Sequence, residues 1–146
     1  MRTLLVGLRV TDLDRSTVFY QALGYTVVGQ VPETAFGTLT MLQLPDDPFV
    51  TVELVHDPSR PIRADGGLNH LAIKVEDLHA TIATLAANGI EADPADPTAD
   101  PDEPLVSHLR DPDGYLIELV QWPEGHSDGI TEDDFTSDQR RDNGKR

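Results

Sequence analysis

The chain has 146 residues, of which 38% are hydrophobic, and this size suits one compact domain. Its 26 Asp and Glu against 11 Lys and Arg give a net charge of −15, which argues against nucleic acid or an anionic membrane as a partner. The absence of Cys excludes disulfides and thiolate chemistry. No apolar run reaches the length of a signal peptide or a membrane span, so we expect a cytoplasmic protein.

The first half of the chain predicts the order strand, helix and three strands. Residues 3–10 are a short apolar run. A helix is expected from about Asp14 to Leu23, with Asp12 or Asp14 as its cap and Gly24 as its end. Three β-branched or aromatic runs then predict strands at 25–30, 36–44 and 49–56.

The second half predicts the same order. The pattern favours a strand at 68–75, a helix from 77 to 88 and a short strand at 90–93. A hairpin of residues 105–110 and 115–121 is expected around the turn sequence Asp111-Pro112-Asp113-Gly114. We therefore expect one domain over residues 1–122, made of repeats 3–56 and 68–121 with a linker at 57–67, followed by a polar tail at 123–146.

The two halves are copies of one unit, offset by 65 positions, as Glu53 is from Glu118. The stretch Leu8-Arg9-Val10-Thr11-Asp12-Leu13 aligns with Ile73-Lys74-Val75-Glu76-Asp77-Leu78. A repeat that keeps its register over such a length indicates two copies of a supersecondary unit, each too small to bury a core alone. The same offset aligns Leu5 with His70.

Strand alternation predicts which residues share a face. The uniformly apolar positions near Glu53 and Glu118 are expected beneath the helices, which leaves both glutamates on the opposite face. A buried carboxylate is costly unless it is paired or coordinated. Two such sheets would form a cup with Glu53, His70 and Glu118 at its base and Arg9 and Lys74 nearer the rim. We therefore predict a ligand-binding cup.

Several motifs resemble the vicinal oxygen chelate superfamily, which includes glyoxalase I, methylmalonyl-CoA epimerase, extradiol dioxygenases and the fosfomycin and bleomycin resistance proteins. The motifs are Leu8-Arg9-Val10-x-Asp12-Leu13-Asp14-Arg15-Ser16-x-x-Phe19-Tyr20-x-x-Leu23-Gly24-Tyr25, Asn69-His70-Leu71-Ala72 and Asp111-Pro112-Asp113-Gly114-Tyr115-x-Ile117-Glu118-Leu119. The resemblance implies an α+β fold in which two βαβββ modules form a cupped mixed sheet. It also implies a homodimer, a small-molecule ligand and a divalent metal in the cup.

The resemblance implies metal ligands at Glu53, His70 and Glu118, and a fourth at Leu5. A leucine cannot coordinate a metal, and an extradiol dioxygenase would need His at that position. One His with two carboxylates suits Mn²⁺, Fe²⁺ or Mg²⁺ more than structural zinc, while Ni²⁺ and Zn²⁺ stay open. The alternative is a metal-free cup in which the carboxylates share a proton or pair with Arg9, Lys74 or His70.

Two classes of function follow. In the first, a glyoxalase-like lyase or isomerase acts on a small oxygen-rich or carbonyl metabolite, with Glu53 or Glu118 moving a proton and Arg9, Lys74 and His108 contacting substrate. Whether His108 or Ser107 faces the cup depends on the register of the hairpin. In the second, a metal-free protein of the resistance type binds a drug or metabolite. Such cups are typically aromatic, and aromatic residues are only 5% of this chain, which favours the enzyme.

Overall fold

The computed structural model describes residues 2–62 and 68–130, so the centre of the predicted linker and residues 131–146 of the tail lie outside the described residues. Within these two ranges, two helices and seven strands follow one another in the order β1 Val6–Arg9, α1 Leu13–Ala22, β2 Thr26–Thr34, β3 Gly37–Gln43, β4 Val52–His56, β5 His70–Lys74, α2 Leu78–Ala87, β6 Leu105–Arg110 and β7 Leu116–Gln121. Among the described residues, no helix is long and apolar enough to cross a membrane.

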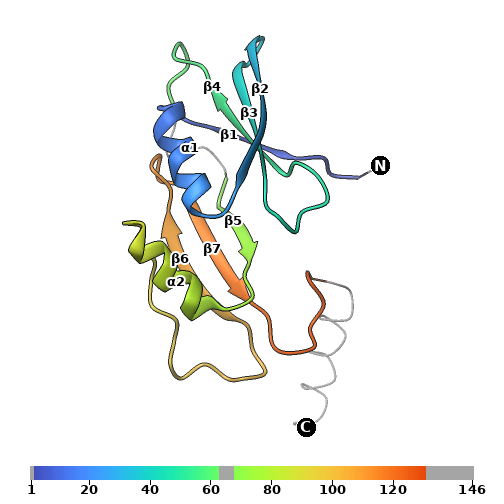
Figure 1. Ribbon diagram of the computed structural model, residues 1–146, viewed down its shortest axis with the longest axis vertical. Coiled ribbons are helices and arrows are strands. Elements are labelled where there is room, and N and C mark those ends of the chain that lie inside the picture. The colour runs from blue at the N-terminus through green and yellow to red at the C-terminus, as the bar shows by residue number, and fades with distance from the viewer. Residues whose placement is uncertain (1, 63–67, 131–146) are drawn as a thin grey trace.

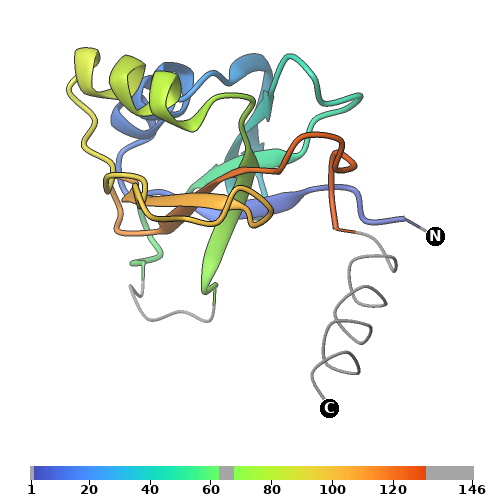
Figure 2. The same ribbon diagram turned by 90° about the horizontal axis from the view of Figure 1, so that it is seen from below.

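The strands form two mixed sheets, one in each half of the chain (Figure 1). The first has the order β1-β4-β3-β2 and the second β5-β7-β6. In each sheet the first strand of the module runs parallel to the last, while the other pairs are antiparallel. Both helices lie on the same side of the sheets (Figure 2). The predicted α+β fold of two βαβββ-type modules is confirmed, although the strands belong to two sheets instead of one.

The strand register follows the sequence repeat for the parallel pairs. Gly7 lies opposite Glu53 in the first module, and Ala72 lies opposite Glu118 in the second. The antiparallel hairpins differ, because Met41 is opposite Glu53 whereas His108 is opposite Glu118. The connection at 111–115 is shorter than the one at 44–51. The shorter turn shifts the second hairpin by two residues relative to the 65-residue repeat.

The short strand predicted at residues 90–93 is wrong, since the segment between α2 and β6 contains no assigned strand. It still touches β6 through Asp93, whose amide donates to the carbonyl of His108 at 2.8 Å and whose carbonyl accepts from the Ser107 hydroxyl at 2.5 Å. Pro94 follows immediately and has no amide hydrogen to continue a ladder. The second sheet therefore has three strands.

Both helices begin at an aspartate in equivalent positions of the repeat. The side chain of Asp12 accepts a hydrogen bond from the amide of Arg15, and that of Asp77 from the amide of Ala80, each at 2.9 Å. A carboxylate at this position satisfies an amide that has no partner within the helix and interacts favourably with the helix dipole. Of the two caps considered for the first helix, Asp12 is the one used.

One hydrophobic core joins the two modules. Tyr20 of α1 and Leu54 of β4 are fully buried, as are Ile117 of β7 and Leu85 of α2, and all four belong to a single cluster. These strand residues alternate with Glu53 and Glu118, which therefore lie on the sheet faces opposite the helices. We call these the helix-free faces. The strand alternation predicted for the glutamates is confirmed.

Candidate functional site

Glu118 and His108 lie close together on the helix-free face of the second module. They are opposite one another on β7 and β6, and His108 Nε2 lies 3.3 Å from Glu118 Oε2. Their side chains are 27% and 41% exposed, so both are accessible to a small molecule. Ser107 is buried on the other side of β6. The register therefore gives this face to His108, which resolves the alternative left open by the sequence.

His70 lies on the same helix-free face. It stands on β5 two residues before Ala72, which is the residue opposite Glu118. It is opposite Leu116, while Ala72 is opposite Glu118, and cross-strand partners point to the same side of a sheet. The His70 side chain is exposed, and its Nδ1 is 2.7 Å from Oδ1 of Asn69. The second module thus carries two histidines and one carboxylate on a single face.

The helix-free face of the first module carries Glu53, and neither of its two cross-strand neighbours is a histidine. Its neighbours across the sheet are Gly7 on β1 and Met41 on β3. A methyl group added at Gly7 would lie 3.6 Å from Glu53 Oε1, so the carboxylate extends over the glycine. Leu5 precedes β1 and offers no atom that could act as an acid, a base or a ligand.

The predicted metal ligands do not come together in one chain. Within residues 2–62 and 68–130, no group of three or more His, Asp and Glu side chains is placed to hold a metal ion. Glu53 lies on the first sheet, whereas His70 and Glu118 lie on the second. Together with Leu5 in the fourth position, this arrangement does not fit a metal site built by a single chain.

Lys74 and Arg9, the two basic residues predicted near the rim, contact groups other than Glu53 and Glu118. Lys74 Nζ lies 2.6 Å from a Glu76 oxygen and 2.7 Å from an Asp128 oxygen. Hydrogen bonds to Asp128 and then to Glu76 raise the pKa of Lys74. The backbone carbonyl of Arg9 accepts from the Tyr115 hydroxyl at 2.9 Å. In the part of the chain that the structure describes, neither residue forms an ion pair with Glu53 or Glu118.

Asp113 has a role that the turn sequence alone did not reveal. Its side chain is only 4% exposed, and it receives hydrogen bonds at the start of α1. The donors are the Thr11 amide and hydroxyl at 3.2 and 2.6 Å, the Ser16 hydroxyl at 3.4 Å and the Arg15 guanidinium at 3.3 Å. We call this contact between the β6–β7 turn and α1 the closed junction. The sequence offers one signal for it, because a turn does not require two aspartates.

Asp111 completes the closed junction. Its carboxylate accepts from the Tyr20 hydroxyl at 2.9 Å and from the amides of Asp113 and Tyr115, also at 2.9 Å. Burial raises the pKa of Asp111, and these hydrogen bonds oppose the rise. Burial, followed by the charge of Asp111, also raises the pKa of Tyr20. The two aspartates of the turn therefore connect the modules, whereas the candidate catalytic residues lie on the helix-free faces.

Comparison with known proteins identifies the family. Residues 3–119 match the Glyoxalase/Bleomycin resistance protein/Dioxygenase superfamily. The chain is 34% identical over 131 residues to a probable lactoylglutathione lyase of Vibrio cholerae, covering 86% of this chain and 94% of that protein. It is 32% identical over 126 residues to a lactoylglutathione lyase of Haemophilus influenzae, covering 83% and 93%.

Solved structures share the fold. A glyoxalase/bleomycin resistance protein/dioxygenase domain from Frankia has a TM-score of 0.70 at 22% identity, covering 86% of this chain and 95% of the other. An antibiotic-binding protein from a Streptomyces species has a TM-score of 0.64 at 24% identity, covering 83% and 95%. Identities this low support the fold alone. From the match over residues 3–119 and the similarity to the two lyases, the chain belongs to the glyoxalase/bleomycin resistance protein/dioxygenase superfamily.

Proposed function

We propose that the protein is a glyoxalase-like lyase or isomerase that moves a proton next to the carbonyl group of a small metabolite. The observation that carries the proposal is the pair of His108 Nε2 and Glu118 Oε2, 3.3 Å apart on a helix-free face. A carboxylate and an imidazole at this separation can hold and transfer a proton. The similarity to lactoylglutathione lyases supports a thioester of a hydroxy acid as substrate class.

In the proposed reaction, Glu118 acts as the general base. Its carboxylate takes a proton from the carbon beside the carbonyl, and the electron pair of that bond moves towards the oxygen to form an enediolate. The proton is then delivered to the neighbouring carbon while the hydroxyl proton moves from one oxygen of the enediolate to the other, so atoms and electrons balance without an oxidant. His108 donates a hydrogen bond that orients the carboxylate, which requires its Nε2 to carry the proton.

No step of this reaction runs through a metal. Lactoylglutathione lyases are the relatives that motivate a divalent ion, but the described side chains of one chain do not fit such a site. Whether the protein binds a divalent ion is therefore a question for titration with Mn²⁺, Fe²⁺, Ni²⁺, Mg²⁺ and Zn²⁺. The ligand set Glu53, His70 and Glu118 is a proposal for an assembly in which the two helix-free faces meet.

We also propose a homodimer, in which a second copy covers these faces. β1 and β5 are edge strands of their sheets, and each pairs with one neighbour only. Leu4 and Val6 beside this edge are 74% and 39% exposed. An open edge flanked by exposed apolar side chains favours association. Sedimentation velocity tests the proposal, and a monomer at micromolar concentration would contradict it.

Proton exchange tests the enzymatic function directly. The protein is incubated with S-lactoylglutathione in D₂O, and ¹H NMR follows the loss of the signal from the hydrogen beside the thioester carbonyl. We expect catalysed exchange by the wild type and its loss in Glu118→Gln. Glu91→Gln, which changes charge equally on an exposed residue outside the site, serves as the control and should exchange like the wild type. Equal exchange by all three proteins would contradict the proposal.

The second candidate is a metal-free protein that binds a drug or metabolite. Leu5 favours this candidate, because it removes a possible ligand from the helix-free face of the first module. Binding and catalysis differ in their response to Glu118→Gln. A binding protein would retain a ligand without exchanging its hydrogens in D₂O, and isothermal titration calorimetry combined with the exchange experiment separates the two functions.

A further inference from the structure

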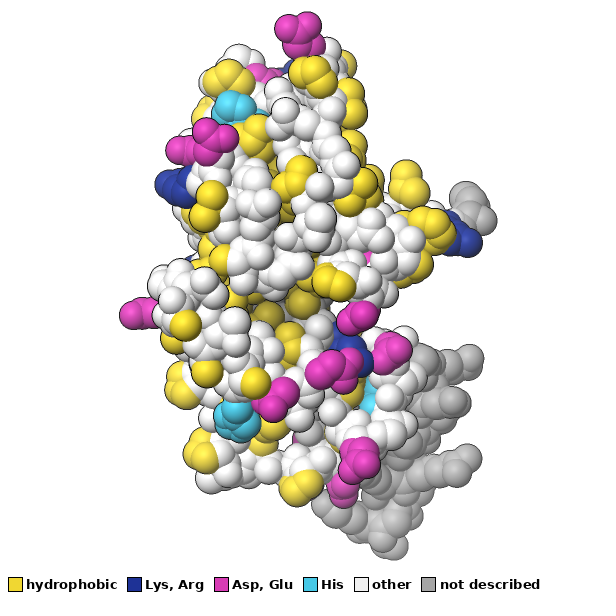
Figure 3. Space-filling model, in the orientation of Figure 1, with side chains coloured by type: hydrophobic (Ala, Val, Ile, Leu, Met, Phe, Trp, Pro, Cys, Tyr) yellow, Lys and Arg dark blue, Asp and Glu magenta, His cyan; other side chains and the backbone are white. Residues whose placement is uncertain are grey.

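A pocket lies between the modules, apart from the proposed proton transfer. It has a volume of about 1010 Å³, and its walls come from residues 3–6, 44–47 and 71–76, together with Asp128 at the end of the described chain. The space-filling view shows this hollow between the two halves of the molecule (Figure 3). His108 and Glu118, the residues proposed for proton transfer, do not line it, whereas Lys74 does. A volume of this size accommodates a drug-sized molecule.

Part of the pocket wall is apolar. Leu23 and Leu44 line it from the first module, and Leu71, Ile73 and Val75 line it from β5 and the residue that follows. Contact with these side chains would remove the apolar part of a ligand from water, which is the main favourable term in binding such molecules. The interior therefore selects for a ligand with an apolar body.

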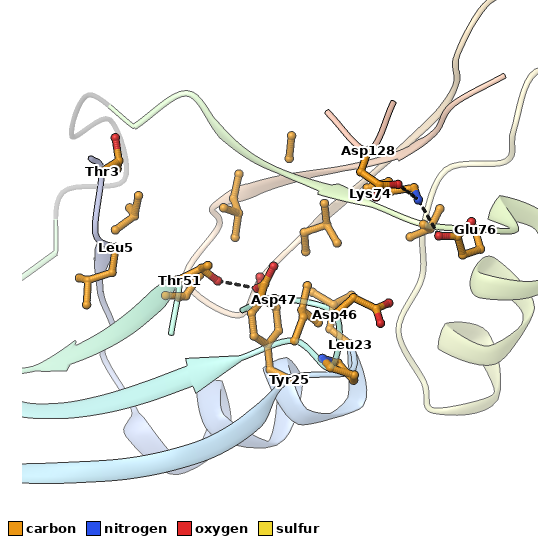
Figure 4. A pocket seen from close by; sticks show the side chains of 18 of the residues that line it. Thr3, Leu5, Leu23, Tyr25, Asp46, Asp47, Thr51, Lys74, Glu76 and Asp128 are labelled. Carbon is orange, nitrogen blue, oxygen red and sulfur yellow. Dashed lines mark hydrogen bonds and ion pairs between the residues drawn. The ribbon is translucent and has the colours of Figure 1, made fainter. Parts of the chain in front are cut away.

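The rim of the same pocket is acidic. Four carboxylates line it, from Asp46, Asp47, Glu76 and Asp128, against the single ammonium of Lys74. The ammonium is already shared by Glu76 and Asp128, at 2.6 and 2.7 Å. Asp46 and Asp47 belong to the β3–β4 connection and lie across the pocket from this group (Figure 4). The negative charge of the rim therefore exceeds what Lys74 can offset.

The carboxylate of Asp47 also reaches towards the interior. It accepts a hydrogen bond from the Thr51 hydroxyl at 2.8 Å, which fixes its direction. Tyr25 lies on the pocket wall, where burial and then the negative charge of Asp47 raise its pKa to about 12. The negative charges of Asp46 and Asp47 would attract a positively charged group that lies between them.

We propose that the inter-module pocket binds an organic cation, a molecule whose apolar body fills the interior while its ammonium or amidinium group lies between the carboxylates of Asp46 and Asp47. An anionic ligand of the same shape would be repelled by four carboxylates. This site goes beyond the proposed proton transfer, because it uses neither His108 nor Glu118. Its ligand class also matches a protein whose net charge is −15.

Three probes with one apolar body and different charges test the proposal. Naphthylmethylammonium, naphthylmethanol and naphthoate are titrated into the full chain by isothermal titration calorimetry. We expect one ammonium bound per chain, with an affinity about tenfold or more above that of naphthoate. The double variant Asp46→Asn/Asp47→Asn should lower the affinity for the ammonium about fivefold or more and leave that for naphthylmethanol unchanged.

A matched variant separates a local effect from the overall charge. Glu91→Gln/Asp93→Asn changes the net charge equally at exposed positions outside the pocket, and it should bind the ammonium like the wild type. Equal losses in both double variants would overturn the proposal, as would equal affinity for all three probes. A dimer that binds no ammonium would also overturn it and would assign the pocket to the second copy. Glu118→Gln should leave ammonium binding unchanged, which distinguishes this site from the proposed catalytic one.

Discussion

The two ends of the interface between the modules are built from equivalent segments of the repeat. One end is the closed junction, and the other end is open and contains the pocket. At the closed junction, Thr11 and Ser16 donate hydrogen bonds to Asp113. The residues that replace them in the second copy of the repeat are Glu76 and Thr81, and both line the pocket. A threonine can donate to an approaching carboxylate, whereas a glutamate repels it. The β3–β4 connection, which carries Asp46 and Asp47, accordingly has no threonine donor at this position, and a pocket lies there.

The helix-free faces have diverged in a similar way. Glu53 and Glu118 are equivalent in the repeat and in the parallel register, but their antiparallel neighbours are Met41 and His108. A shorter turn in the second hairpin is enough to exchange an inert neighbour for an imidazole. The duplicated unit therefore supplies two carboxylates, and within residues 2–62 and 68–130 only Glu118 has a histidine as its hydrogen-bond partner.

The largest expected effect tests this difference between the glutamates. Glu118→Gln removes the proposed base and should lower the rate of hydrogen exchange into S-lactoylglutathione by about 10²-fold or more. Glu53→Gln is the matched change at the equivalent position, where no histidine is adjacent, and should lower the rate by about tenfold at most. His108→Gln should lower the rate less than Glu118→Gln and should alter its pH profile. Equal losses at both glutamates would show that the reaction uses the two modules alike.

The closed junction should respond to mutation more strongly than the open one. Asp113→Ala removes the charged acceptor of the Thr11 amide and hydroxyl and of the buried Ser16 hydroxyl, and the start of α1 loses a favourable charge. We expect a loss of about 2–4 kcal/mol in the free energy of unfolding, measured by urea denaturation. Asp46→Ala, an exposed position in the β3–β4 connection, should change it by less than about 0.5 kcal/mol. Similar losses for both variants would contradict the distinction between the junctions.

Much of this comparison could be predicted from the sequence, because the repeat and strand alternation depend on local pattern. They predicted the paired modules and the faces that carry Glu53 and Glu118. Alternation does not fix how two sheets lie relative to one another, so it could not predict that, among the described residues, Glu53, His70 and Glu118 do not form one metal-binding group. It also left the position of His108 open, since turn length decides the hairpin register. The bonds of Asp113 join segments nearly a hundred residues apart, and only the tertiary structure brings them together.

A titration with metal ions tests whether the two faces can cooperate in an assembly. If Glu53, His70 and Glu118 meet in a homodimer, Leu5 leaves one position without a ligand. Leu5→His should then tighten the binding of Mn²⁺, Ni²⁺ or Zn²⁺ by on the order of 1–3 kcal/mol, as measured by calorimetry. His70→Ala in the same background should remove the gain. If no metal ion binds to the wild type or to Leu5→His, the result favours the metal-free binding function.

The smallest expected effect concerns the pH dependence of the closed junction. Burial raises the pKa of Asp111 above its unfolded value, so the stability it contributes is present below the unfolded pKa and is lost as pH rises through the folded one. The free energy of unfolding of the wild type, measured relative to Asp111→Asn, should therefore fall as pH increases from about 3 to about 6. Asp96 provides a control of opposite sign, because hydrogen bonds from Thr98 lower its pKa. Relative to Asp96→Asn, the wild type should gain stability over the same range. If both comparisons change in the same direction, Asp111 is not titrating as a buried group, and its hydrogen bond with Tyr20 would then outweigh desolvation at the junction.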